Sequence, residues 1–240
     1  MSYVDAIISE LTALGSLKKA HNNARFFKIQ PGDYADYDVF LGVSLPEIRS
    51  IAARFTQIGF DDLTTLFHSQ FHEVRLCAAI ILSRQYLEAG STSDNNYFFE
   101  FYLKQVNGGF INNWDIVDVS APIFGRHLLI CSNSSEILTR LTKSTSLWER
   151  RVAVMFTFAF IKEGIYHPTY SIAMDCLVDE EDLIHKATGW MLREMGKRDI
   201  ALLRKFLTEH SHVMPRTMLR YAIEKLPESE RKKWLKVKKS

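Results

Sequence analysis

The chain has 240 residues, and 30 Lys and Arg against 28 Asp and Glu give a formal net charge of +2. Hydrophobic residues make up 47% and charged residues 24%, which excludes a mostly disordered or collagenous chain. Six Pro and 11 Gly are about 7% of the positions, against roughly 12% on average, and this favours helices over a turn-rich β-sandwich or barrel.

Apolar residues recur every three or four positions almost throughout, which predicts amphipathic helices. Val4 to Leu14 forms the first, and Pro46 lies where a proline suits the start of the second. Further helices are expected at 61–68, 73–88, 95–105, 114–129, 134–143, 148–163, 168–178, 183–197, 200–210 and 215–225. The longest irregular segment is 29–41. The sequence shows no convincing alternating pattern of the kind that predicts β-strands. We expect an all-α fold.

Some of these helices resemble one another. The segments 71–78, 147–153 and 183–190 each place a basic residue in the first turn, followed by small and apolar residues. The spacing from Arg75 to Arg151 equals two units of about 38, and Lys186 follows about 35 later. Such periods are typical of HEAT- or armadillo-like solenoids, whose helix pairs must stack to bury their apolar faces. We expect one domain over 1–240, a curved α-α superhelix of HEAT-like repeats.

The basic residues of these repeats would line up on one face of a solenoid, usually the concave one. Such a row would follow a polyanion; it comprises Arg49, Arg75, Arg151, Lys186, Arg193, Arg216 and Arg220. The end of the chain, 231–240, is also strongly basic. Either a solvated, partly disordered tail or a DNA contact explains it.

One short segment could carry chemistry. Trp114 and Asp118 are four residues apart and so share a helix face, with Asn113 suited to the helix N-cap. From this segment alone, a packing role for Trp114 and a surface role for Asp118 are the favoured interpretation. Trp190 follows Lys186 by four and should share the face of the basic row. Gly189 before it should have a packing reason, because glycine inside a helix costs about 1 kcal/mol relative to alanine.

Four motifs in this order resemble the AlkD-like DNA alkylation repair proteins, over about residues 20–225. They are Leu41-Gly42-Val43-x-x-Pro46-x-x-Arg49, Trp114-Asp115-x-Val117-Asp118, Trp148-x-x-Arg151-x-Ala153 and Lys186-Ala187-x-Gly189-Trp190-x-Leu192-Arg193-Glu194. That family contains HEAT-like-repeat glycosylases that remove N3- and N7-alkylated purines.

The resemblance implies a role for each matched residue. Asp118 would be the catalytic carboxylate, Trp114 and Trp190 would contact the lesion nucleotide, and Arg151 would contact the DNA backbone beside it. Phe26, which lies where a relative has Tyr, would be a further lesion-contacting ring that lacks the hydroxyl. The lesion base would not need to enter a deep pocket.

The chemistry agrees with this interpretation. An N3- or N7-alkylated purine is cationic and leaves as a neutral base, so its glycosidic bond needs no acid. An anion beside the developing oxocarbenium and a placed water suffice, and indole faces attract cations. We expect no metal or cofactor, since no P-loop, dinucleotide fingerprint or His-Glu-x-x-His motif occurs.

The expected partner is duplex DNA containing alkylated purines, bound by a monomer that leaves an abasic site. No stretch suits a membrane span and no signal peptide is evident, so we expect a cytoplasmic protein, associated with the nucleoid in a bacterium. Two alternatives stay open: a non-catalytic HEAT-repeat protein that binds branched or distorted DNA, and a protein-binding HEAT scaffold.

Overall fold

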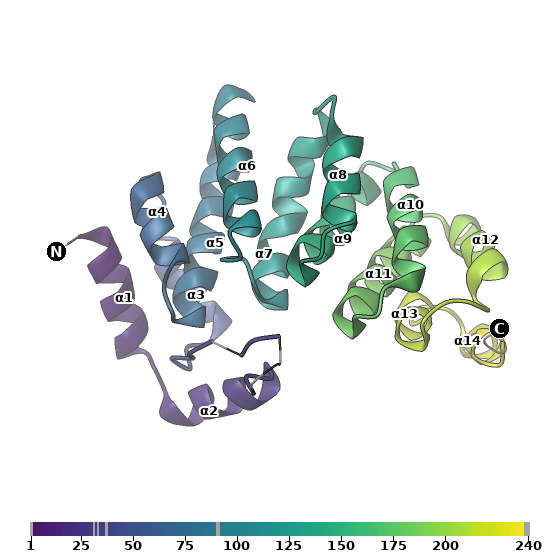
Figure 1. Ribbon diagram of the computed structural model, residues 1–240, viewed down its shortest axis with the longest axis horizontal. Helices are drawn as coiled ribbons and strands as arrows, with labels where there is room; N and C mark the ends of the chain where they lie inside the picture. The colour runs from purple at the N-terminus through teal and green to yellow at the C-terminus, as the bar shows by residue number, and fades with distance from the viewer. Residues whose placement is uncertain (1, 31, 33, 37, 90–91, 238–240) are drawn as a thin grey trace. The chain divides into compact units, whose positions relative to one another are not determined.

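The computed structural model describes residues 2–30, 32, 34–36, 38–89 and 92–237. Their contacts divide the chain into two compact units, Met1–Ser120 and Ala121–Ser240. Both units consist of helices, coloured from purple to teal and from teal to yellow in Figure 1. Within the described residues no β-strand forms, and one isolated bridge joins Val39 to Phe71. The all-α prediction is confirmed, and the single-domain interpretation stays a prediction.

The first unit is built around the long buried helix α5. Its elements are α1 (Tyr3–Ala13), α2 (Leu17–Phe26), α3 (Leu45–Ala52), α4 (Phe60–Phe67), α5 (His72–Glu88), α6 (Thr92–Asn107) and most of α7 (Trp114–Phe124). Helices α3, α4 and α6 pack on α5, which is buried over most of its length. Capping boxes start α1, between Ser2 and Asp5, and α3, between Ser44 and Glu47.

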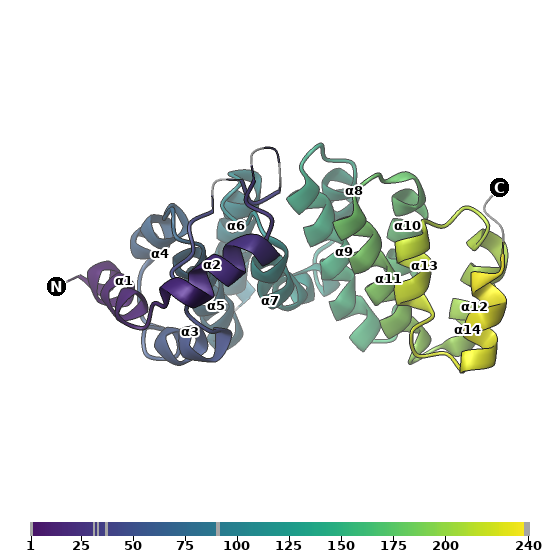
Figure 2. The ribbon, with the colours of Figure 1, turned by 90° about the horizontal axis from the view of Figure 1, so that it is seen from below.

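The second unit repeats helix pairs around α9 and α11. Its elements are η1 (Gly125–Leu129), α8 (Ser134–Thr142), α9 (Leu147–Lys162), α10 (His167–Asp175), η2 (Cys176–Val178), α11 (Asp182–Gly196), α12 (Ile200–His210), α13 (Arg216–Ala222) and α14 (Glu228–Leu235). Figure 2 shows α11 beside α13 and α12 beside α14. A Cβ at Gly189 would lie 2.4 Å from the Met218 carbonyl oxygen, so this glycine has the expected packing reason: it lets α11 and α13 approach.

Two predicted helices change form before their expected ends. The helix expected at 114–129 ends at Phe124 and continues as the 3₁₀ turn η1, and that expected at 168–178 ends as η2. At the first change, Gly125 lies so close to α9 that an added Cβ would be 2.5 Å from the Phe156 carbonyl oxygen. We infer that this close approach, rather than helix propensity, fixes where α7 ends.

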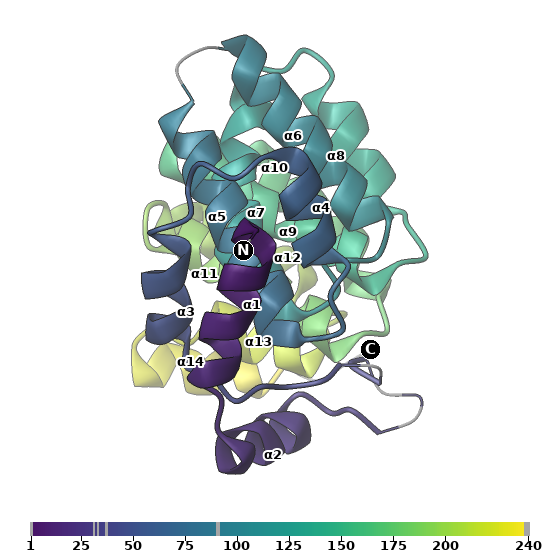
Figure 3. The ribbon, with the colours of Figure 1, turned by 90° about the vertical axis from the view of Figure 1, so that its left-hand side faces the viewer.

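Helix α2 was not predicted as a helix. It lies across one end of the first unit's other helices, as Figures 1 and 3 show. Gly42 allows the start of α2 to pack closely against the segment before α3. This glycine has φ +80°, and an added Cβ would lie 2.2 Å from the Ser16 carbonyl oxygen. The carboxylate of buried Glu73 accepts the N–H groups of Leu41, Gly42 and Val43, at 2.9, 2.8 and 3.4 Å. A buried charge on α5 therefore holds the segment against which α2 packs.

Three helices of the repeats share a hydrogen bond, which changes the pairing of equivalent residues expected from the sequence spacing. The fourth residue of each of the helices α5, α9 and α11 donates a hydrogen bond to the carbonyl six residues earlier. The donors are Arg75 at 2.8 Å, Arg150 at 3.0 Å and His185 at 2.6 Å. Arg75 is thus equivalent to Arg150, one position before Arg151. Because the donor bonds to the connection that precedes its helix, the basic residue at this position has a structural role in each of these three helices.

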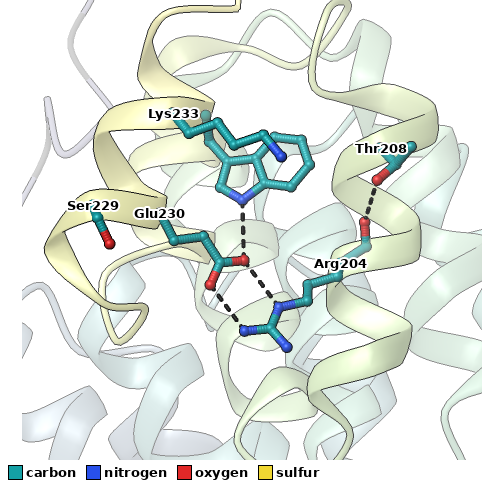
Figure 4. Close-up of a pocket in the computed structure, with 6 residues that line it drawn as sticks. Arg204, Thr208, Ser229, Glu230 and Lys233 are labelled. Carbon is teal, nitrogen blue, oxygen red and sulfur yellow. Dashed lines mark hydrogen bonds and ion pairs between the residues drawn. The ribbon is translucent and has the colours of Figure 1, made fainter.

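The basic end of the chain is helical through residue 235. In α14, Trp234 is buried, and Glu230 binds the Arg204 guanidinium through two contacts of 2.9 Å, as Figure 4 shows. The Trp234 indole N–H also donates to Glu230. The expectation of disorder is therefore wrong for 231–235, because an apolar ring and a bidentate ion pair hold them on α12. Residues 238–240 lie outside the described residues.

Candidate functional site

The first residues of α7 are fixed by side chains from distant parts of the first unit. Asn113, which is fully buried, accepts the Trp114 N–H at 2.8 Å and donates to Asp38 at 3.0 Å. The Asp115 side chain accepts a hydrogen bond from the backbone N–H of Ile116 at 2.8 Å. Polar side chains thus satisfy N–H groups of the first turn that have no partner within the helix.

The Trp114 indole belongs to an aromatic cluster on the loop after α2. It stacks on Phe27 with ring centroids 5.1 Å apart and planes inclined by 9°, and Phe26 meets it edge-on at 5.9 Å. Phe27 is buried, Trp114 is half-buried, and Phe26 is 67% exposed. The cluster therefore presents a partly open aromatic surface to solvent, as expected for rings that meet a planar ligand.

A buried histidine links this cluster to α7. The His72 ring, 2% exposed, places Nδ1 3.0 Å from Asp38 Oδ2 and Nε2 2.8 Å from Asp115 Oδ2. The other oxygen of Asp38 accepts from the Arg75 guanidinium. Phe27 and Phe40 lie against the His72 ring, with centroids 5.0 and 4.7 Å away. Hydrogen bonds thus join two carboxylates, an imidazole and a guanidinium, with two aromatic rings against the imidazole.

The charges of this network follow from its contacts. Burial by itself would lower the pKa of His72, but the Asp115 charge and the hydrogen bonds to Asp115 and Asp38 raise it to about 9. Burial alone would raise the pKa of Asp38, but His72 and Arg75 hold it below its usual value. At neutral pH the network therefore contains a protonated imidazole between two carboxylates.

Asp118 lies one turn after Trp114 on α7 and is half-buried. Near it, the Tyr102 hydroxyl bonds with Ser120 Oγ at 3.1 Å. Burial raises the pKa of Tyr102, and the negative charge of Asp118 adds to the effect. Trp114 and Asp118 thus lie one turn apart on α7, Phe26 meets Trp114, and a neutral phenol lies in electrostatic reach of the Asp118 carboxylate.

Two of the predicted DNA-backbone residues are buried. Arg75 and Arg151 are each 4% exposed. Arg75 bonds Asp38 and the Ser69 carbonyl, and Arg151 donates to the Leu183 carbonyl at 2.6 Å. Both side chains are engaged inside their own units, so the structure does not place them as surface cations. This position does not suit the predicted phosphate contacts.

The remaining basic residues differ in their exposure and partners. Arg49 and Arg220 are exposed. Lys186 lies 2.8 Å from Asp182, Arg193 pairs with Glu224, and Arg216 donates to the Leu235 carbonyl, at the end of α14, at 2.8 Å. Four of the predicted basic residues occupy the fifth position of their helices: Arg49, Arg151, Lys186 and Arg220. The sequence therefore identified an equivalent position in these helices, but it did not show which of the four side chains are buried.

Trp190 is half-buried on α11 of the second unit. Its indole N–H donates to Glu194 at 3.1 Å, and Glu194 also binds Lys197 at 2.7 Å. Trp190 therefore has a fixed ring edge and a partly exposed surface.

Helix α2 carries a basic surface that sequence analysis overlooked. Lys18, Lys19 and Arg25 are exposed, as are the flanking Lys28 and the ring of Phe26. None of the helix's residues, all of which the structure describes, is buried, and its sequence has no acidic residue. The sequence does show several basic residues close together in this segment. The apolar pattern of the segment is weak, however, and did not predict a helix.

The chain is similar to known DNA repair proteins over most of its length. Residues 7–226 match the family described as "DNA alkylation repair enzyme". The chain belongs to the DNA alkylation repair enzyme family. This confirms the family resemblance seen in the sequence motifs, and the match covers both units and all four motifs.

A solved structure shares the fold of this DNA alkylation repair family member. It is named "Predicted DNA alkylation repair enzyme from Enterococcus faecalis", with a TM-score of 0.69 and 17% sequence identity, over 89% of this chain and 97% of that one. Among curated proteins, none matches significantly. In the part of the chain that the structure describes, no helix is long and apolar enough to cross a membrane.

Proposed function

We propose that this family member is a monofunctional DNA glycosylase that hydrolyses the N-glycosidic bond of cationic N3- and N7-alkylated purines in duplex DNA. The observation that carries the proposal is the face of α7, where Trp114 and Asp118 are one turn apart beside the exposed ring of Phe26. The product would be an abasic site and a free alkylated base.

The reaction needs little from the protein. The alkylated purine already carries positive charge, and it departs as a neutral base when the bond to the sugar breaks. Positive charge then develops on the sugar, where the Asp118 carboxylate would stabilise it and accept a proton from the attacking water. An aromatic face such as that of Trp114 attracts the cationic base by about 0.5–2 kcal/mol.

Cations at the surface support binding to a duplex. The exposed side chains of α2, with Arg49, supply positive charge on the unit that carries Asp118. Arg220, Lys186, Arg193 and Arg216 supply it on the second unit, where Trp190 offers a further aromatic contact. Each phosphate that a cation neutralises releases counterions and strengthens binding. For Arg75 and Arg151 we propose instead that they support neighbouring elements from within.

We further propose that the protein works as a monomer, in the cytoplasm or on the nucleoid. Its neighbouring cations and aromatic rings suit damaged DNA as the partner, and no step of the reaction requires a metal or cofactor.

Release of free base tests the proposal against both alternatives. Purified protein is incubated with a duplex containing one N7-methylguanine, and released base and duplex binding are measured separately. We expect base release and salt-dependent binding. Binding without release would favour the non-catalytic DNA-binding alternative, and the absence of both would favour a protein-binding scaffold.

A further inference from the structure

We propose that His72 is a positioning residue, which ties the first turn of α7 to the loop after α2 and thereby sets the orientation of Trp114 and Asp118. This inference rests on the proposed function, in which those two residues act on the lesion. His72 and Asp38 lie outside the motifs that suggested the family, and Asp115 lies within one of them but has no role assigned by the resemblance.

Three consecutive residues carry the connection between α7 and the rest of the unit. Asn113 donates to Asp38 at 3.0 Å, Trp114 stacks on Phe27, and Asp115 accepts from His72 at 2.8 Å. The loop that supplies Asp38 and Phe27 is in turn joined to the start of α5, where the His72 N–H donates to the Val39 carbonyl at 2.9 Å. His72 therefore contacts both the loop and α7, by backbone and by side chain.

The ring can hold both partners only when it is protonated. Each of its nitrogens faces a carboxylate oxygen, and a carboxylate can only accept. A neutral imidazole has a single N–H, so it would leave one buried carboxylate facing a lone pair. The other charged groups of the network do not replace it, because Arg75 binds Asp38 and Glu73 binds backbone N–H groups.

The electrostatic environment keeps the ring protonated at neutral pH. Burial alone would lower the pKa of His72, but Asp115 and Asp38 raise it to about 9. Deprotonation above that pH should release Asp115 first, because Asp38 retains Arg75 and Asn113. The first turn of α7 then loses its tie to α5, and Trp114 and the carboxylate one turn later lose their fixed orientation.

A single substitution can separate this role from general stability. In Asp115→Asn, the amide N–H₂ can donate to Nε2 of a neutral His72 while Nδ1–H donates to Asp38, so the bridge forms without a proton on both nitrogens. His72→Gln lacks the second ring nitrogen and cannot donate in both directions from separate atoms. His167→Gln, at an exposed histidine of α10, is the matched control.

The first measurement needs no substrate. The full chain is labelled with 5-fluorotryptophan, the Trp114 signal is assigned by Trp114→Phe, and its ¹⁹F shift is followed from pH 6.5 to 10. We expect a transition near pH 9 in the wild type and in His167→Gln, and none in Asp115→Asn. A Trp114 signal that does not titrate in the wild type, or that titrates identically in Asp115→Asn, overturns the proposal.

The second measurement is the single-turnover rate of base release across the same pH range, with the no-enzyme rate subtracted. A misplaced catalytic group costs one to two orders of magnitude, so the wild-type rate should fall at least about tenfold above pH 9. Affinity for undamaged duplex should stay within a few-fold, and Asp115→Asn should keep a flat profile. If no base is released at any pH while the Trp114 signal still titrates, the proposed function fails and the positioning role of His72 stands.

Discussion

The indole of Trp114 and the ring of Phe27 stack with centroids 5.1 Å apart and planes 9° from parallel. Phe27 is buried and Trp114 is half-buried, so one face of the indole is committed to the protein and only its other surface can meet a ligand. The same ring thus has a structural contact and a binding surface, and the two can be altered separately.

Substitutions at the two rings should separate these contributions. Trp114→Ala removes the binding surface, and we expect slower excision of N7-methylguanine together with little change in binding to undamaged duplex. Phe27→Leu keeps an apolar side chain and removes the stack, which should cost about 0.5–1.5 kcal/mol of stability and affect excision less. Single-turnover rates and urea unfolding measure the two effects, and equal losses of excision and undamaged-duplex binding in Trp114→Ala would mean that the indole only packs.

Gly42→Ala should detach α2 from the first unit. The new Cβ would meet the Ser16 carbonyl oxygen at 2.2 Å, and φ at this residue is +80°. Gly164→Ala is the matched control, with φ +74° and no atom within 4 Å of the new Cβ. The left-handed backbone alone costs on the order of 1 kcal/mol, so Gly42→Ala should lose clearly more stability than the control. Limited proteolysis after α2 should accelerate only in Gly42→Ala, and equal behaviour of both variants would contradict the proposed docking.

The stability contributed by His72 should depend on pH. Its pKa rises from 6.5 in the unfolded chain to about 9 in the folded protein, so the contribution is complete below pH 6.5 and is lost as pH rises through 9. The shift corresponds to roughly 3 kcal/mol at most. Urea unfolding of the wild type and His72→Gln should show a difference that shrinks between pH 6.5 and 9.5, and a difference independent of pH would argue against a protonated ring.

The cations of α2 should contribute to DNA affinity without base specificity. Lys18→Gln and Arg25→Gln should each lower the slope of log K against log salt by about one unit, the value for one phosphate contact. Lys205→Gln, at an exposed position of α12, provides a control on the second unit. Fluorescence anisotropy with undamaged duplex at several salt concentrations gives the slopes, and unchanged slopes in both α2 variants would remove α2 from the interface.

Periodicity located most of the helices but not the surroundings of single residues. The apolar spacing predicted the long helices α5, α9 and α11 closely, because their buried faces dominate the pattern. Helix α2 was missed because none of its residues is buried, and α14 because it is polar apart from Trp234 and Leu235. The ends of α7 and α10 were misplaced, since at α7 a close approach to another helix decides the end.

The candidate site shows the same limit. Trp114 and Asp118 could be paired from their spacing, because four residues make one helical turn. Arg75 could not be recognised as buried, because its partner Asp38 is 37 residues away on an irregular loop. His72 gave no signal either: its two carboxylates come from positions 34 and 43 residues away, and only the folded chain brings them together.

The most direct measurement is the single-turnover rate of N7-methylguanine release by Asp118→Asn, with lesion-duplex affinity measured in parallel. The substitution keeps the size of the side chain and removes the charge that we propose stabilises the developing oxocarbenium, which should cost at least about 10²-fold in rate. We predict that release is abolished while affinity stays within a few-fold of wild type. An Asp118→Asn protein that releases the base at the wild-type rate would contradict the assignment of Asp118 as the catalytic carboxylate.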